Sequence, residues 1–122
     1  MMNIKVVIAG VSGRMGHALL EGVFADPQLQ LHAALDRADS PKIGQDAGAH
    51  LGKKSGINIS SDVATALKDA DVLGDVTRPD ASLQYLEACK QAGVKQWVGT
   101  TGFRLEQKAK MKAASKEVSI EF

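Results

Sequence analysis

The sequence predicts an α/β fold, a doubly wound and mostly parallel sheet of about six strands with helices on both faces. Short apolar runs rich in β-branched residues alternate with segments of helical period, which is the pattern of βα units around a parallel sheet. The first apolar run passes directly into a turn that contains regularly spaced glycines and then into an amphipathic segment. A strand, a glycine turn and a helix in immediate succession are typical of folds that bind ligands at the carboxyl edge of the sheet.

The predicted strands are short apolar runs bounded by turn residues. In chain order they cover 4–9, 29–35, 57–59, 71–76, 95–99 and 118–122. Between the second and third of these, the segment 36–56 is rich in Gly, Lys, Ser and Asp. This composition predicts an irregular excursion over the strand ends and not a regular helix.

Four helices are predicted between the strands. The first begins near Gly13 and ends at about Ala25, because apolar residues recur at helical spacing until Asp26-Pro27. The second covers 63–70 after a plausible cap at Ser61 or Asp62. The third follows Thr77 and is terminated by Gly93, and the last covers about 105–115. We expect the only cysteine, Cys89, to lie buried in the third helix as a small apolar residue.

Length and charge limit the classes of function. A chain of 122 residues is expected to form one domain. Its 15 basic and 14 acidic residues give 15 − 14 = +1 and are interleaved, so no block of charge indicates nucleic acid or a membrane surface as partner. A single cysteine excludes an intrachain disulfide, and no apolar run approaches membrane-spanning length. We expect a soluble, cytoplasmic protein.

The glycine turn is the first candidate site. Gly10, Gly13 and Gly16 have the spacing G-x-x-G-x-x-G, and a helix that starts there offers free N–H groups and a positive dipole to a phosphate. Gly10 would permit the tight turn, Gly13 would let a pyrophosphate approach the backbone, and Gly16 would let the helix pack closely on the first strand. The common motif has a glycine where this chain has Val11, so glycines that serve only to turn the chain are the alternative.

Asp36 makes dinucleotide binding more specific. It falls at the predicted end of the second strand, twenty residues after Gly16, where a carboxylate can accept hydrogen bonds from an adenosine ribose. Arg37 follows at once and could hold the 2′-phosphate of NADP. The pair predicts that both NADH and NADPH are accepted. Arg14 is a second candidate for phosphate or adenine contact, with a solvated helix arginine as the alternative.

Two later strand ends carry threonines. The stretches "DVTRP" at 75–79 and "GTTGF" at 99–103 follow apolar strands, and we expect their hydroxyls to face the same crevice at the carboxyl edge. Backbone N–H and Oγ groups there could hold a nicotinamide carboxamide or a substrate carboxylate. The alternative is that both stretches are capping and turn residues.

Other catalytic and metal-binding patterns are not recognisable. The three histidines, His17, His32 and His50, have no metal-ligand spacing among themselves or with Cys89, so we assign them no role and expect no metal. No P-loop, Ser/His/Asp arrangement or pair of catalytic carboxylates is evident. A reductase needs a proton donor for its product, and the sequence offers no candidate.

The motifs "IAGVSGRMG", "LDR", "DVTRP" and "GTTGF", in this order and at these intervals, resemble those of the 4-hydroxy-tetrahydrodipicolinate reductase (dihydrodipicolinate reductase) family of bacterial lysine biosynthesis, through the diaminopimelate route. The segment "GQDAGAHLG" at 44–52 is also similar to that family. The resemblance extends from about residue 3 to the last residues of the chain. It implies a Rossmann-type NAD(P)-binding domain over 1–122, in an oxidoreductase that uses NADH or NADPH to reduce a cyclic imine dicarboxylate to tetrahydrodipicolinate.

The resemblance also assigns roles to individual residues. The turn would hold the pyrophosphate, Asp36 the ribose and Arg37 the 2′-phosphate, and Thr101 would also lie close to the substrate. Where many members of the family have a bulky residue after the aspartate of "DVTRP", this chain has Val76. The residues implied at the cofactor site are Gly10, Val11, Ser12, Gly13, Arg14, Met15, Asp36, Arg37, Gly99, Thr100 and Thr101.

The family's catalytic H-H-x-x-K stretch and its homotetramer contacts belong to a second domain that has no counterpart in these 122 residues. We therefore expect this polypeptide to act as the cofactor domain, to contain no catalytic residue of its own and to lack turnover alone. Two alternatives remain from the sequence. One is a different small-substrate dehydrogenase, of an aspartate or homoserine type, and the other is a non-catalytic NAD(P)-sensing module.

Overall fold

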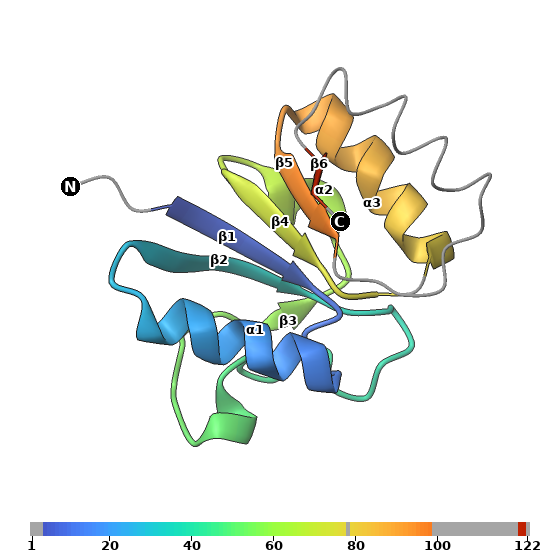
Figure 1. The fold of residues 1–122 in the computed structure, drawn as a ribbon. Helices are drawn as coiled ribbons and strands as arrows, with labels where there is room; N and C mark the ends of the chain where they lie inside the picture. The colour runs from blue at the N-terminus through green and yellow to red at the C-terminus, as the bar shows by residue number, and fades with distance from the viewer. Residues whose placement is uncertain (1–3, 78, 99–119, 122) are drawn as a thin grey trace.

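The computed structural model describes residues 4–77, 79–98 and 120–121, and the fold is shown in Figure 1. Strands and helices alternate along the chain as the sequence predicts, with one short 3-10 helix, η1, in the long excursion. The elements are β1 (Ile4–Ala9), α1 (Arg14–Ala25), β2 (Leu29–Leu35), η1 (Ala49–Leu51), β3 (Ile59–Ser60), α2 (Val63–Leu67), β4 (Val72–Asp75), α3 (Pro79–Ala92), β5 (Lys95–Val98) and β6 (Ile120–Glu121).

The strands form one parallel sheet in the order β3-β2-β1-β4-β5-β6. The chain starts at the centre with β1, builds outward through β2 and β3, and then returns to the other side of β1 with β4. The direction of winding therefore reverses between β1 and β4, which is where open sheets of this type leave a crevice at their carboxyl edge. The predicted fold class, a Rossmann-type doubly wound sheet, is confirmed.

Helices lie on both faces of the sheet (Figure 1), and a cluster of buried apolar residues lies on each face. Successive residues of a strand point to opposite faces, so Val6 and Ile8 of β1 pack with α1, while Val7 and Ala9 pack with α2 and α3. The pairing of β1 with β2 shifts register between Val6 and Val7. All four residues of β1 that serve these cores are almost fully buried, which makes β1 the central support of the crevice.

Local chemistry explains where the helices begin and end. The side chain of Asp62 accepts a hydrogen bond from the backbone N–H of Thr65 and so caps α2, as the sequence predicts. Gly93 adopts a φ of 71° immediately after α3, a left-handed conformation that ends helices and favours glycine. Cys89 of α3 is fully buried, as expected.

The excursion between β2 and β3 is irregular, as predicted, and is organised around one carboxylate. Asp46 accepts hydrogen bonds from the backbone N–H groups of Gly48, Ser55 and Gly56 and from the Ser55 hydroxyl. These donors hold the pKa of Asp46 well below its ordinary value, with the Ser55 N–H as the largest cause. The charged form of this side chain therefore ties the two ends of the 46–56 loop together.

The third strand differs from its predicted position. It covers Ile59–Ser60 and not 57–59, because the residues before it pair elsewhere. Asn58 forms an antiparallel bridge with Asp46, and the Ile57 carbonyl accepts from the Ala47 N–H at 2.8 Å. Only from Ile59 onward does the chain pair with β2.

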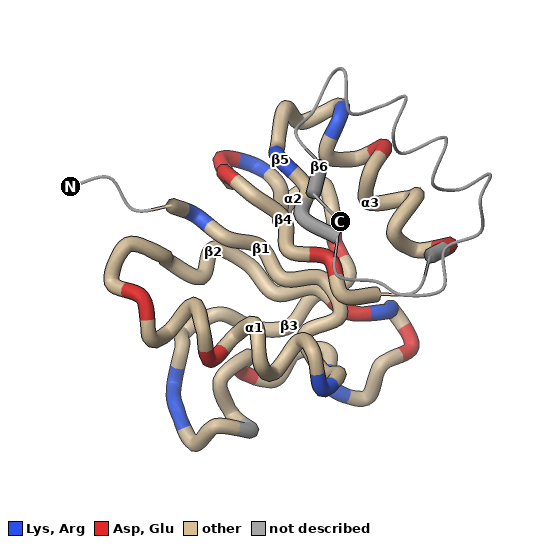
Figure 2. Tube along the Cα trace, in the orientation of Figure 1, with Lys and Arg blue, Asp and Glu red and all other residues tan. Residues whose placement is uncertain are grey.

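The remaining boundaries agree within a residue or two for β4 and β5, whereas the second predicted helix ends at Leu67, earlier than expected. Of the predicted last strand, Ile120–Glu121 lies parallel to β5 as β6, and the predicted helix at 105–115 lies outside the described residues. Acidic and basic residues are interleaved along the tube in Figure 2. Among the described residues, no helix is both long and apolar enough to cross a membrane.

Candidate functional site

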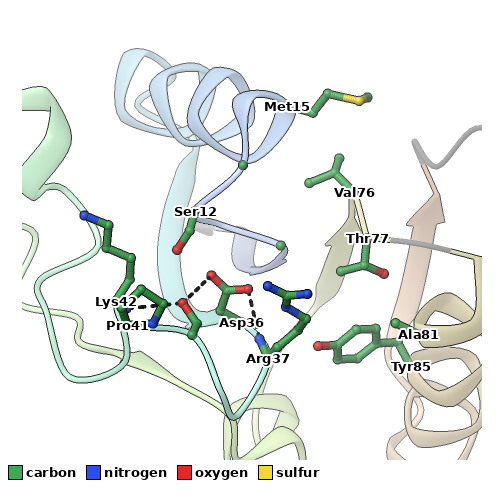
Figure 3. Close-up of a pocket in the computed structure, with 13 residues that line it drawn as sticks. Ser12, Met15, Asp36, Arg37, Pro41, Lys42, Val76, Thr77, Ala81 and Tyr85 are labelled. Atoms are coloured by element: carbon green, nitrogen blue, oxygen red, sulfur yellow. Dashed lines mark hydrogen bonds between the residues drawn. The ribbon is translucent and has the colours of Figure 1, made fainter.

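A cavity of about 680 Å³ opens at the carboxyl edge of the sheet, at the point where the strand order reverses. Its walls come from the turn after β1, the segment after β2, the residues that follow β4 and the first turns of α3, as Figure 3 shows. The lining residues are Gly10, Ser12, Gly13, Met15, Asp36, Arg37, Ser40, Pro41, Lys42, Val76, Thr77, Ala81 and Tyr85. The structure thus brings the predicted glycine turn and the predicted Asp36-Arg37 pair to one cavity.

Two glycines of the motif, one in the turn and one in the first turn of α1, are required by the fold itself. Gly10 has a φ of 85°, and a Cβ there would come within 3.0 Å of the Val76 carbonyl oxygen. A Cβ on Gly16 would collide with the carbonyl oxygen of Gly10. Sequence reasoning placed the close approach of Gly16 against the first strand, and the structure places it against the turn that follows that strand. Both glycines therefore let α1 start immediately beside β1 and β4.

Gly13 is different, because the protein does not need a glycine there. Its φ of −85° and ψ of 173° are open to any residue, and the nearest atom to a Cβ would be the Gly10 carbonyl oxygen at an ordinary 3.6 Å. Gly13 also precedes α1, caps it without a side chain and lines the cavity. A side chain at this position would extend from the turn where a ligand would approach the first N–H groups of α1.

The other residues of the turn divide between core and surface. The Val11 side chain is buried in the core under α1, and its N–H donates to the Leu35 carbonyl at 3.2 Å. Met15 is 49% exposed and lines the cavity. Arg14 is exposed at the first position of α1 and is not among the lining residues. The valine in place of the usual glycine thus serves packing.

Asp36 lies at the end of β2, where the sequence predicts it, and its carboxylate is fixed by its own loop. Oδ1 accepts from the Arg37 N–H at 2.9 Å, and Oδ2 accepts from the Ser40 hydroxyl at 3.3 Å. The Asp36 N–H donates to the Ser60 carbonyl of β3 at 3.0 Å. These contacts hold the carboxylate at the cavity wall, with the Arg37 side chain beside it in Figure 3.

Asp75 supports the opposite wall from behind. It is fully buried at the end of β4, where Oδ1 accepts from the N–H and the hydroxyl of Thr77 at 2.9 and 2.6 Å. Its Oδ2 accepts from the Gln96 amide of β5 at 3.1 Å. Thr77 lines the cavity, as the sequence predicts for this strand end, and its hydroxyl donates its hydrogen to Asp75. A buried carboxylate needs donors, and Thr77 supplies two.

Several lining residues were not predicted as site residues. Ser40, Pro41 and Lys42 lie in an irregular loop, and Ala81 and Tyr85 lie on one side of α3. Helical spacing of Ala81 and Tyr85 after a strand end was the one signal that could have indicated the latter pair. Burial, and then the charges of Asp75 and Asp36, raise the pKa of Tyr85 to about 12. Tyr85 therefore presents a neutral phenol to the cavity.

The residues present fit a dinucleotide. The turn offers a helix N-terminus without a side-chain cap, Gly13 leaves the approach open, and the buried Ser12 hydroxyl has no hydrogen-bond partner among the described residues. Asp36 and Tyr85 line the same cavity. A carboxylate is the type of group that accepts from ribose hydroxyls, and an aromatic ring is the type of surface against which a base packs.

Three implied site residues, Gly99, Thr100 and Thr101, lie outside the described residues. No group of three or more His, Cys, Asp or Glu residues that could hold a metal ion is found in the described part of the chain.

Fold and site together define an α/β domain with a ligand cavity at the point where the winding of its sheet reverses. Residues 4–122 match the family model described as dihydrodipicolinate reductase, N-terminus. The chain therefore belongs to the dihydrodipicolinate reductase family, whose members are oxidoreductases of lysine biosynthesis, and corresponds to its N-terminal domain.

Named relatives agree with this assignment. The chain is 50% identical over 121 residues to the 4-hydroxy-tetrahydrodipicolinate reductase of Chromobacterium violaceum, covering 99% of this chain and 45% of that protein. It is 46% identical over 122 residues to the reductase of the same name from Burkholderia pseudomallei, covering 46% of that protein. The chain thus spans just under half the length of these relatives.

Solved structures confirm the fold. A dipicolinate-bound dihydrodipicolinate reductase from Paenisporosarcina sp. TG-14 superposes with a TM-score of 0.72 and 24% identity, covering 93% of this chain and 43% of that one. GenD2 from gentamicin A biosynthesis, solved in complex with NAD, gives a TM-score of 0.80 and 20% identity, covering 99% of this chain and 34% of that one.

Proposed function

We propose that this chain binds NADH or NADPH across the carboxyl edge of its sheet and serves as the cofactor domain of a reductase that converts 4-hydroxy-tetrahydrodipicolinate to tetrahydrodipicolinate. The proposal rests chiefly on the position of Gly13. It is a cavity-lining glycine that neither its backbone conformation nor its protein neighbours require. A ligand that must approach the turn closely explains the missing side chain, and family membership supports a dinucleotide as that ligand.

The residues have separate roles in this proposal. The N–H groups of the turn between Gly10 and Met15 hold the pyrophosphate at the positive end of α1. Asp36 accepts from the adenosine ribose hydroxyls, Arg37 contacts a 2′-phosphate where there is one, and Tyr85 forms a wall for the adenine. The family resemblance assigns the nicotinamide to Gly99, Thr100 and Thr101, and places Thr101 also near the dicarboxylate substrate.

The bound nicotinamide supplies the hydride. The described residues bind and orient the dinucleotide. Asp75 fixes the loop at Val76 and Thr77 from behind, and β2 anchors the glycine turn through the hydrogen bond from the Gly10 N–H to the Leu35 carbonyl. We assign the proton donor and the tetramer contacts to the second domain of the family, so this chain alone has negligible turnover.

The proposal is tested by titrating the folded chain with NADH and following the nicotinamide fluorescence. We expect saturable binding, which Asp36→Ala weakens because the ribose hydroxyls lose their acceptor. Asp39→Ala is the matched control, because Asp39 is in the same loop and outside the cavity, and its side chain is 80% exposed. A folded chain that binds no dinucleotide would contradict the cofactor role, and steady reduction of the substrate by these 122 residues would contradict the assignment of the proton donor.

A further inference from the structure

A second, smaller cavity of about 270 Å³ lies beside the first, between the start of α1 and the excursion that follows β2. Ser12 and Lys42 line both cavities and therefore stand at their junction. The other residues of the second cavity are Val11, His17, Gln45, Asp46, Ala47, Ala49 and Ile59.

The Ser12 hydroxyl points to a ligand at this junction. Its oxygen is buried and lacks a hydrogen-bond partner among the described residues, whereas buried hydroxyls are normally paired. In Figure 3 the Ser12 side chain points toward the loop that carries Pro41 and Lys42, close to the Asp36 carboxylate. A group that accepts a hydrogen bond and lies beside the Asp36 end of the cavity would satisfy this hydroxyl.

The charges around the junction favour an anion. In Figure 3 the Arg37 side chain lies beside Asp36, and Lys42 lies on the other side of Asp36 with its side chain extending away from that carboxylate. An arginine and a lysine therefore line this part of the first cavity. Both oxygens of that carboxylate already accept from the Arg37 N–H and the Ser40 hydroxyl. The second carboxylate nearby, Asp46, accepts four hydrogen bonds from its own loop. Its charge is therefore compensated locally.

Arg37 is not the sole source of positive charge for a 2′-phosphate. Its Nε lies 3.6 Å from a carboxylate oxygen of Asp39, with both side chains mostly exposed. Asp39 thus competes for this guanidinium. The backbone of Lys42 is held beside the cavity by the hydrogen bond from its N–H to the Ser40 hydroxyl at 3.2 Å, and no ion pair of the Lys42 side chain is found among the described residues. The same Ser40 hydroxyl donates to Asp36, so the loop couples the position of Lys42 to that of the ribose site.

We propose that Ser12 and Lys42 form a subsite for the 2′-phosphate of NADPH at the junction of the two cavities, and that Lys42 makes this chain prefer NADPH over NADH. This inference rests on the proposed function, since it specifies which dinucleotide the same site takes. The phosphate satisfies the Ser12 hydroxyl and its negative charge is balanced by Lys42, while the ribose of NADH uses Asp36 alone.

The test is a calorimetric titration of the chain with NADH and with NADPH, for the wild type and for Lys42→Ala. We expect the wild type to bind NADPH more tightly, and Lys42→Ala to weaken NADPH binding about tenfold, the size of one lost hydrogen bond to a charged group. NADH binding should be unchanged by this substitution. Ser12→Ala should also reduce the preference for NADPH over NADH. Lys54→Ala is the matched control, because Lys54 is an exposed lysine of the same excursion that lines neither cavity.

The outcomes separate the two proposals. Equal binding of NADH and NADPH by the wild type, or a preference that survives Lys42→Ala, would overturn the subsite and leave the cofactor role intact. Failure of the folded wild type to bind either dinucleotide would overturn both. Thermal unfolding of each variant verifies that a lost affinity does not come from a lost fold.

Discussion

At the scale of single residues, Asp75 shows how a buried charge is used to shape a binding wall. Its carboxylate is fully buried and accepts three hydrogen bonds, two from Thr77 and one from Gln96. Thr77 and Gln96 donate all three bonds, so both oxygens of the carboxylate are used as acceptors. An amide N–H₂ in place of either oxygen would meet one of these donors, so the arrangement suits a carboxylate.

Asp75→Asn should consequently lower the free energy of unfolding by about 1–3 kcal/mol, because an amide N–H₂ would face donors in a buried site. Urea unfolding followed by circular dichroism measures this change. Asp39→Asn, at an exposed position, is the control and should change stability by less than about 0.5 kcal/mol. Equal stability of the two variants would show that the Asp75 network contributes nothing specific.

The lowered pKa of Asp46 predicts that the stability of the fold depends on pH. Hydrogen bonds, above all from the Ser55 N–H, lower the pKa of Asp46 in the folded chain from its ordinary 3.8. Its stabilising contribution is therefore fully present above that value and is lost as pH falls below it toward the folded pKa. Asp62, whose pKa is lowered chiefly by the Thr65 hydroxyl, acts in the same direction.

We expect the urea midpoint to fall when the pH is lowered from neutral to about 3, and to fall by less in Asp46→Asn. The variant should be the less stable of the two at neutral pH and lose less on acidification, since it has no charge left to protonate at residue 46. An identical acid response in wild type and variant would contradict the role of this carboxylate. The Asn side chain is close in size, which keeps packing comparable.

At the scale of elements, helix α1 contains two glycines with opposite predicted behaviour. A Cβ on Gly16 would collide with the Gly10 carbonyl, whereas a Cβ on Gly22 meets no described atom within 4 Å. Gly16→Ala should therefore destabilise the chain by about 1–3 kcal/mol through overpacking. Gly22→Ala should stabilise it by about 0.5–1 kcal/mol through helix propensity. Chemical denaturation of both variants is the measurement, and stabilisation by Gly16→Ala would contradict the close approach of α1 to the turn.

Elements with a strong local signal were predictable from the sequence. Short apolar runs bounded by turn residues located β1 and β2, and the helical period with its stop signals located α1 and α3. The start of β3 was not predictable, because Ile57 and Asn58 pair with residues of the 44–47 segment. Such a pairing across an irregular loop leaves no periodic pattern in the sequence.

The residues of the candidate site also fall into a predictable group and an unpredictable group. The glycine turn and Asp36 were predictable because backbone geometry at a strand end restricts which residues can stand there. Ser40 and Lys42 were not, since their place at the cavity depends on the path of an irregular loop. Nor does a residue pattern show that Asp75 and Gln96 would meet in the core, because they lie on neighbouring strands, β4 and β5.

At the scale of the whole molecule, the one cysteine reports on cooperative unfolding. Cys89 is fully buried between α3 and the sheet, and burial, followed by the charge of Asp75, raises the pKa of its thiol to about 12. A thiol reagent at mildly alkaline pH should label the folded chain far more slowly than the chain in denaturant, because only the exposed thiolate reacts. Labelling of the folded chain at the rate of a free thiol would contradict this burial.

The central claim is that the glycine turn forms a working pyrophosphate site, and Gly13→Val tests it most directly. Its backbone conformation suits any residue, so the variant should fold, while the added side chain occupies the approach to the turn. We predict that calorimetry with NADH and NADPH detects binding to the wild type and to Gly22→Ala, and none to Gly13→Val. Unchanged binding by Gly13→Val would contradict the claim, and so would a folded wild-type chain that binds neither dinucleotide.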